Sequence, residues 1–156
     1  MILFMIAAEV AAASTILVIV QKNAVHALLY LIVSFFAVAV IFLLLGAPFV
    51  AALEVIVYAG AIMVLFIFAV MLIGAQAERV PPSAWIAPVA LSAVILAEIA
   101  YTLFGGGYLA PMQASSIPPR EVGAALIGRY VLGVEVAAFI LLAGLVGAYH
   151  LGRRKE

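Results

Sequence analysis

Long apolar runs follow one another along this chain, and short polar or glycine- and proline-containing breaks separate them. A bilayer core of about 30 Å requires about 20 apolar residues when the chain is helical. Five runs reach roughly that length and predict transmembrane helices: residues 2–20, 25–45, 50–73, 84–104 and 131–151. The pattern therefore predicts an all-α integral membrane protein, with a single transmembrane domain over residues 1–156.

The breaks between these runs carry residues that form turns. Residues 21–23 (QKN) end the first run, and residues 46–48 (GAP) end the second. The third break, 74–83, contains two consecutive prolines, and the fourth, 105–128, is the longest predicted loop. The first run lacks the positive charge that opens a cleavable signal peptide, so we interpret it as a span.

Composition agrees with lipid as the main solvent of the chain. The sequence is 70% hydrophobic and 9% charged, whereas a soluble domain carries about 45–50% apolar and about 25% charged residues. The formal net charge is zero, which argues against nucleic acid as a partner. The absence of cysteine excludes disulfides, thiolate zinc sites and cysteine-ligated iron–sulfur clusters within this chain.

Basic residues are distributed unequally between the two predicted sides of the membrane. The side that holds the N-terminus carries Arg120 and Arg129. The other side carries the remaining five: Lys22, Arg79, Arg153, Arg154 and Lys155. Lysine and arginine accumulate in cytoplasmic loops, so we expect the C-terminus in the cytoplasm and the N-terminus outside. Trp85 and Tyr149 lie near span ends, as interfacial anchors do.

Four carboxylates lie inside the predicted spans: Glu9, Glu54, Glu98 and Glu135. A charged side chain at mid-bilayer costs about 2.5–3.5 kcal/mol on insertion scales. In the predicted orientation all four lie nearer the outer end of their helix, so they are able to occupy one layer. Each is either neutral or satisfied by a neighbouring helix, or it belongs to a proton path. No span contains a lysine to pair with them, so we do not expect a complete proton pump.

The third run contains the most informative stretch of the sequence. Glu54 and Tyr58 are four residues apart and share a helix face, where they can accept and donate hydrogen bonds in sequence. They are our candidates for a proton or water path. Gly60, next to Ala59, is either a packing notch for a neighbouring helix or part of a local irregularity such as a π-bulge. Tyr58, Ala59 and Gly60 are therefore candidates for a helix switch, and Glu98 and Glu135 are secondary candidates.

Several segments resemble one family closely. Residues 25–32 (VHALLYLI) and 54–66 (EVIVYAGAIMVLF) resemble the J subunit of bacterial respiratory complex I, the proton-pumping NADH:quinone oxidoreductase, whose mitochondrial counterpart is NADH dehydrogenase subunit 6. Residues 85–88 (WIAP) and 130–135 (YVLGVE) are similar to that family as well. The resemblance runs from about Lys22 to Gly152. The first span matches only in hydrophobicity, and the tail is shorter than in some relatives.

The resemblance implies a function as well as a place. It implies a multi-pass subunit of the membrane arm in the bacterial inner (cell) membrane, beside subunits A, H, K and N. It implies that the third helix holds a π-bulge near residues 58–60, and that conversion of the bulge to regular helix is linked to a water path from the quinone region towards the pumping subunits. FMN, iron–sulfur clusters, NADH and quinone would bind elsewhere in the complex. The chain itself would carry no cofactor and would be a non-redox subunit, not catalytic in isolation.

Other functions remain open at this point. The chain is also compatible with a subunit of a related membrane-bound hydrogenase or cation/proton antiporter complex. A haem-bearing membrane anchor is a further alternative, because His26 and His150 lie near the cytoplasmic ends of their spans and two histidines can ligate one haem. A free-standing channel or transporter is the last alternative, and the short loops argue against it.

Overall fold

The computed structural model describes residues 1–73, 85–104 and 117–153, and within these ranges the chain is helical without strands. Five helices are long and apolar enough to cross a membrane: Ile2–Val20, Ala24–Leu44, Pro48–Ile73, Ile86–Phe104 and Val131–Gly152. The predicted all-α class with five spans is confirmed. Ala84 as the start of a span, the break at 74–83, residues 105–116, Arg154 and Lys155 lie outside the described residues.

Contacts group the chain into two compact units, Met1–Ser116 and Ile117–Glu156. We describe each unit by itself. The expectation of one transmembrane domain over the whole chain stays a prediction.

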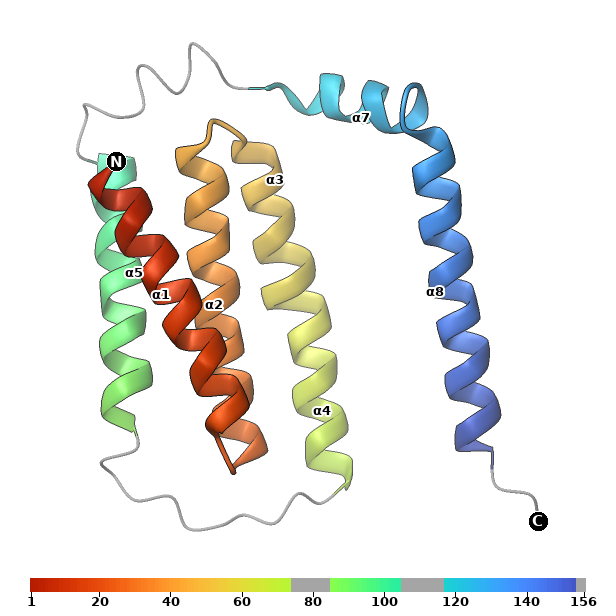
Figure 1. Ribbon diagram of the computed structural model, residues 1–156, viewed down its shortest axis with the longest axis horizontal. Coiled ribbons are helices and arrows are strands. Elements are labelled where there is room, and N and C mark those ends of the chain that lie inside the picture. The colour runs from red at the N-terminus through yellow and green to blue at the C-terminus, as the bar shows by residue number, and fades with distance from the viewer. Residues whose placement is uncertain (74–84, 105–116, 154–156) are drawn as a thin grey trace. The chain divides into compact units, whose positions relative to one another are not determined.

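The first unit begins with a hairpin of two spans, α1 (Ile2–Val20) and α2 (Ala24–Leu44), which lie side by side (Figure 1). Asn23 caps α2, because its side-chain oxygen accepts the N–H groups of Val25 and His26 at 3.0 and 3.2 Å. Such a cap satisfies donors that have no partner within the helix, so α2 begins directly after the short turn. Across the hairpin, the hydroxyls of Thr15 and Ser34 are 3.0 Å apart.

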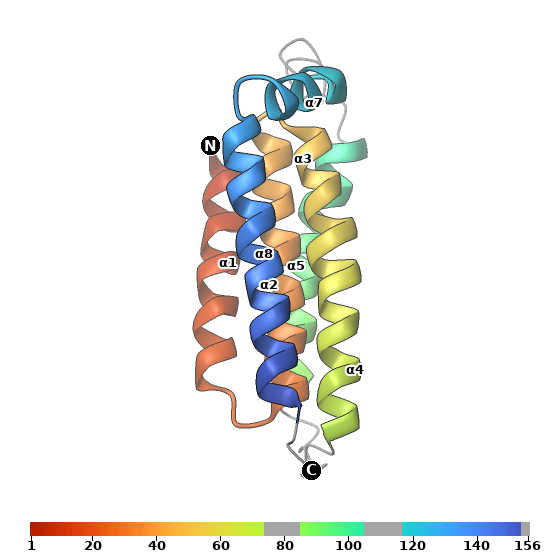
Figure 2. The same ribbon diagram turned by 90° about the vertical axis from the view of Figure 1, so that its right-hand side faces the viewer.

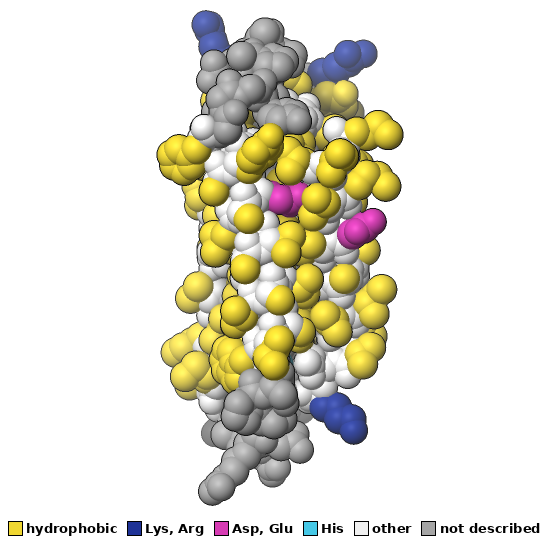
Figure 3. All heavy atoms as spheres, turned by 90° about the vertical axis from the view of Figure 1, so that its left-hand side faces the viewer, with side chains coloured by type: hydrophobic (Ala, Val, Ile, Leu, Met, Phe, Trp, Pro, Cys, Tyr) yellow, Lys and Arg dark blue, Asp and Glu magenta, His cyan; other side chains and the backbone are white. Residues whose placement is uncertain are grey.

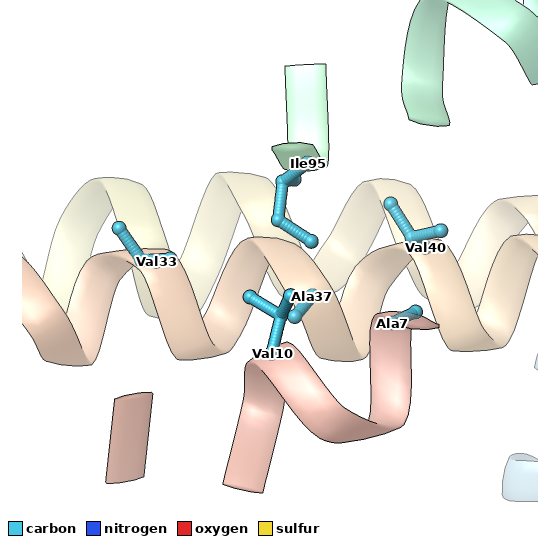
Figure 4. Close-up of a cluster of buried hydrophobic side chains, with 6 residues drawn as sticks. All are labelled: Ala7, Val10, Val33, Ala37, Val40 and Ile95. Atoms are coloured by element: carbon cyan, nitrogen blue, oxygen red, sulfur yellow. The ribbon is translucent and has the colours of Figure 1, made fainter. Parts of the chain in front are cut away.

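Helix α5 (Ile86–Phe104) packs against both helices of this hairpin and completes the core. Figure 4 shows the buried cluster, in which side chains of α1, α2 and α5 point toward one another: Ala7, Val10, Val33, Ala37, Val40 and Ile95. Ala7 and Ala37 are completely buried. Small residues at a contact let helix backbones approach closely, and in lipid this packing replaces the hydrophobic effect as the source of association.

The third span lies along α2 and consists of three consecutive helical segments (Figures 1 and 2). They are α3 (Pro48–Leu53), the π-helical segment η1 (Glu54–Ile62) and α4 (Met63–Ile73). Gly46 turns the chain after α2 with φ of 78°, a left-handed conformation that favours glycine. Pro48 then begins the span, in the first turn where a missing N–H is tolerated.

The second unit contains α7 (Pro119–Ile127) and α8 (Val131–Gly152), joined by a turn (Figure 2). The prediction of a loop over residues 105–128 was wrong for residues 119–127, which form a helix. Pro119 in the first turn has a φ suited to a helix start. Polar residues at 120–121 combine with apolar Val122 and Leu126, which are four residues apart and share a face. Within this unit no residue of α8 is buried.

Candidate functional site

The third span is a π-helix over nine residues in its middle, from Glu54 to Ile62. At its end, the N–H of Met63 donates to two carbonyls, that of Gly60 three residues back and that of Tyr58 five residues back. π-Helices are rare, occur mostly as single-turn bulges inside α-helices, and are frequent at functional sites. The predicted irregularity near residues 58–60 is confirmed, and it begins earlier than expected, at Glu54.

The local sequence favours this unusual backbone. Residues 55–57 are three consecutive β-branched side chains, which lose χ1 freedom in an α-helix and lower its stability. Gly60 follows, and it has the weakest helix preference after proline. A Cβ atom built on Gly60 would lie 3.3 Å from the carbonyl oxygen of Val55, a tight contact. Glycine therefore removes crowding between residues five apart, which are brought together by the π-helical turn.

The π segment packs on α2 with one side only. The ring of Tyr58 lies against the ring of Phe35 on α2, with centroids 5.4 Å apart and planes tilted by 54°. Nevertheless, 46% of the Tyr58 side chain is exposed, and Ile56 and Val57 are exposed as well. No residue of the π segment is buried within the described part of the chain. A large part of its surface thus remains open to lipid or to another protein.

Glu54 and Tyr58 were predicted to share a face and to form a proton or water path. Both belong to the π segment: Glu54 is half-buried at its start, and Tyr58 turns toward Phe35. Within the described residues no hydrogen bond joins the Glu54 carboxyl to the Tyr58 hydroxyl. Their chemical roles, and those of Ala59 and Gly60 in a switch, stay predictions.

The other intramembrane carboxylates differ in burial. Glu9 on α1 and Glu135 on α8 are exposed. Figure 3 draws the left-hand side of Figure 1, and on that face acidic side chains lie among apolar ones. Glu98 on α5 is only 5% exposed, and within the described ranges neither of its carboxylate oxygens has a hydrogen-bond partner. The backbone carbonyl of Glu98 accepts a bond from the Thr102 hydroxyl at 2.7 Å. The expectation that all four carboxylates form one layer stays a prediction, because Glu135 belongs to the other unit.

Sequence reasoning missed an aromatic contact between α2 and the residue before α5. His26 is 3% exposed, and its ring meets that of Trp85 edge-on, with centroids 4.9 Å apart. Among residues 1–73, 85–104 and 117–153, neither ring nitrogen of His26 has a hydrogen-bond partner. Both residues had been placed near the cytoplasmic side of their spans, and that shared level was the available signal. His150, the other half of the haem alternative, is exposed in the second unit. Among the described residues, no group of three or more potential ligands is placed to hold a metal ion.

Comparison with known proteins identifies the family. The sequence profile of NADH-ubiquinone/plastoquinone oxidoreductase chain 6 matches residues 14–151. NADH-quinone oxidoreductase subunit J of Pseudomonas aeruginosa is 47% identical, over 97% of this chain and 95% of that protein. The subunit J of Escherichia coli K12 is 46% identical, over 98% of this chain and 86% of that protein. The subunit J of Rhodobacter capsulatus is 35% identical, over 97% and 80%.

The chain belongs to the NADH-quinone oxidoreductase subunit J family. This confirms the resemblance drawn from residues 25–32 and 54–66. The matched region of the subunit J family contains the whole π segment, Glu98 and Glu135, whereas Glu9 lies before it. The family also favours the NADH enzyme over the hydrogenase, antiporter and haem-anchor alternatives.

Proposed function

We propose that this chain is a membrane-arm subunit of a proton-translocating NADH:quinone oxidoreductase, and that its third span helps couple quinone reduction to proton pumping. The observation that carries the proposal is the π segment Glu54–Ile62 in the middle of a membrane span of a subunit J family member. The identity with subunit J proteins supports membership in the complex, and the unusual backbone supports a role in coupling.

The physical basis is the different hydrogen-bond register of a π-helix and an α-helix. Converting i→i−5 to i→i−4 bonding displaces one residue from the turn. One residue of an α-helix corresponds to about 100° of rotation and about 1.5 Å of rise. Conversion therefore requires α3 and α4 to rotate relative to each other, or a residue to be expelled from the turn. Either change alters which side chains of the third span face α2. A segment with two discrete arrangements is the kind of element that transmits a signal between distant sites.

The π segment carries polar groups whose positions this motion would change. A carboxylate inside a span marks a functional site by default, because its insertion is costly. We infer that Glu54 and Tyr58 line a proton or water path whose continuity changes with the register of η1. No span of this chain contains a lysine, so the pumping itself would belong to neighbouring subunits. We expect subunits of the A, H, K and N types as those neighbours, and the unburied surface of the π segment supports contacts with them.

We also infer where the cofactors and the two ends of the chain lie. The sequence has no cysteine, so thiolate-ligated iron–sulfur clusters must be held by other chains. FMN, NADH and quinone sites are likewise assigned to other subunits. The distribution of basic residues supports a multi-pass protein of the bacterial cell membrane with its C-terminus in the cytoplasm.

The composition of the purified complex tests membership. A complex captured through an affinity tag after Glu156 should contain flavin and iron and should oxidise NADH. A complex that contains a nickel-bearing hydrogenase subunit, or that lacks flavin and NADH oxidation, would contradict this part of the proposal.

Substitutions of Glu54 test the path. Glu54→Gln should preserve most of the pumping, because glutamine keeps a hydrogen-bond acceptor that can hold water, whereas Glu54→Ala should lower it more. Glu9→Gln, which changes an exposed carboxylate on α1, is the matched control and should have no effect. Pumping and quinone reduction are measured in membrane vesicles. If Glu54→Gln is as damaging as Glu54→Ala, the carboxylate itself carries the proton, and a path governed by the backbone is wrong.

A further inference from the structure

An apolar groove runs between α2 and α5, on a part of the first unit that the proposed coupling role does not use. Two adjoining cavities of about 190 and 350 Å³ form it, and Ile32, Val33, Ser92 and Leu96 line both. The Ser92 hydroxyl donates to the Pro88 carbonyl at 2.7 Å, so it offers no free donor to the groove. The groove therefore presents a nearly continuous hydrocarbon surface.

The groove extends from the edge of the membrane at Trp85 past the middle of α5. Its lining begins at Trp85 and ends at Ile99. Over that stretch a helix rises about 21 Å. The hydrocarbon core of a bilayer is about 30 Å thick, so one leaflet contributes about 15 Å, and the interfacial region adds several more. The groove is thus longer than one leaflet, so an acyl chain can lie along it from the interface inward.

The end of the groove at Trp85 has the features of a headgroup site. Trp85 is 49% exposed, as expected of an interfacial anchor. Its contact with His26 places the residue before α5 beside the first turn of α2. Lys22 is exposed in the turn that precedes α2. A cation at this level attracts the phosphate of a lipid whose acyl chain points into the membrane.

We propose that this groove holds one acyl chain of a phospholipid, with the phosphate of the lipid near Lys22. A transmembrane helix, about 10 Å across, would pack over this groove and would not enter it. An acyl chain is narrow enough to enter. Bulk lipid is as apolar as the groove, so retention comes from van der Waals packing along α2 and α5 and from the attraction between phosphate and Lys22.

Photolabelling of the assembled complex tests the proposal. The complex is reconstituted in vesicles of phosphatidylethanolamine and phosphatidylglycerol that contain phosphatidylglycerol with a diazirine in its acyl chain. It is then washed with detergent, irradiated and digested, and the labelled peptides are identified by mass spectrometry. We expect adducts on the α2 and α5 residues that line the groove, and these adducts should survive the wash.

Substitutions on one helix distinguish resident lipid from bulk lipid. Ser92→Phe fills the centre of the groove and should abolish the adducts, and Ala93→Phe provides the same test if the first variant assembles poorly. Ala90→Phe adds the same ring to α5 at an exposed position that lines neither cavity, so labelling of the groove should persist. Lys22→Gln should lower labelling about fivefold, the effect of one cation near the surface.

Two results would overturn the assignment. One is equal labelling of the groove in the wild-type, Ser92→Phe and Ala93→Phe complexes. The other is the absence of washed-stable lipid adducts in the wild-type complex, which would mean that a helix of another subunit covers the groove.

Discussion

Replacing Gly60 by valine changes the backbone element on which the coupling proposal depends. A Cβ atom at this position would lie 3.3 Å from the Val55 carbonyl oxygen. Alanine needs that oxygen to give way by a few tenths of an ångström. Valine adds two methyl groups beside the same backbone atom and has one strongly preferred χ1 rotamer in a helix. The substitution should therefore disfavour the π-helical register more than alanine does.

The size of the effect follows from the crowding. A side chain pushed about 30° away from its rotamer costs about 0.5–1.5 kcal/mol. If valine bears that cost only in the π-helical form, the ratio of the two registers shifts by roughly two- to thirteenfold. Gly60→Ala should fall at or below the lower end of that range. The fraction of the π-helical register should therefore fall in the order wild type, Gly60→Ala, Gly60→Val.

The assay separates electron input from coupling. The Gly60→Val complex should assemble, and electron transfer from NADH to an artificial acceptor upstream of quinone should persist, because that chemistry lies outside this chain. Quinone reduction and proton pumping should fall together, since a coupled machine does not run one without the other. Gly144→Val is the matched control, because a Cβ atom at Gly144 in the regular helix α8 meets nothing within 4 Å.

Two results would refute the reasoning. Wild-type pumping by normal amounts of the Gly60→Val complex would reduce the third span to a packing element. An equal loss of pumping in Gly144→Val would show that valine disturbs these spans in general, without a special role for the π segment.

Three further predictions concern topology, redox chemistry and stability. A reporter that is active only in the cytoplasm should work when fused after Glu156, and activity of an external reporter there would reverse the orientation. The isolated subunit should be colourless, and a Soret band that disappears in His26→Ala would instead favour a haem anchor. Glu98→Met should stabilise the first unit by about 1–3 kcal/mol, because it removes a buried carboxylate that has no hydrogen-bond partner in the described part of the chain. Detergent denaturation measures this, and destabilisation would show that Glu98 has a partner in the assembled complex.

The sequence predicted the spans well because their signal is local. An apolar run of the right length leaves the backbone no alternative to a helix in lipid. Asn23 and Pro48 mark helix starts by chemistry that depends only on neighbouring residues. Gly60 indicated an irregular turn in the third span, and the resemblance to the family predicted that this turn is a π-bulge. The extension of the π-helix back to Glu54 was not predicted, because it depends on hydrogen bonds that compete closely with those of an α-helix.

What the sequence left open depends on packing between distant residues. Glu54, Glu98 and Glu135 are alike in the sequence, yet Glu98 alone among them is buried by neighbouring helices. The contact of His26 with Trp85 joins α2 to a residue almost sixty positions away. Residues 119–127 were taken for a loop because the pair Pro118-Pro119 is a turn signal, although Pro119 begins a helix there. The burial of Glu98 and the His26–Trp85 contact depend on how the helices pack together. The role of Pro119 depends on its position at the start of a helix. A local sequence pattern contains neither kind of information.

The backbone register of the third span, compared in the intact complex at rest and during NADH oxidation, tests the coupling role most directly. Electron cryomicroscopy of the two states shows which carbonyl accepts the N–H of Met63. We predict that the carbonyls of Tyr58 and Gly60 share this N–H in one state, as they do in this structure, and that Ala59, four residues back, is the acceptor in the other. A π-helix with the same register in both states would contradict a switch in this span.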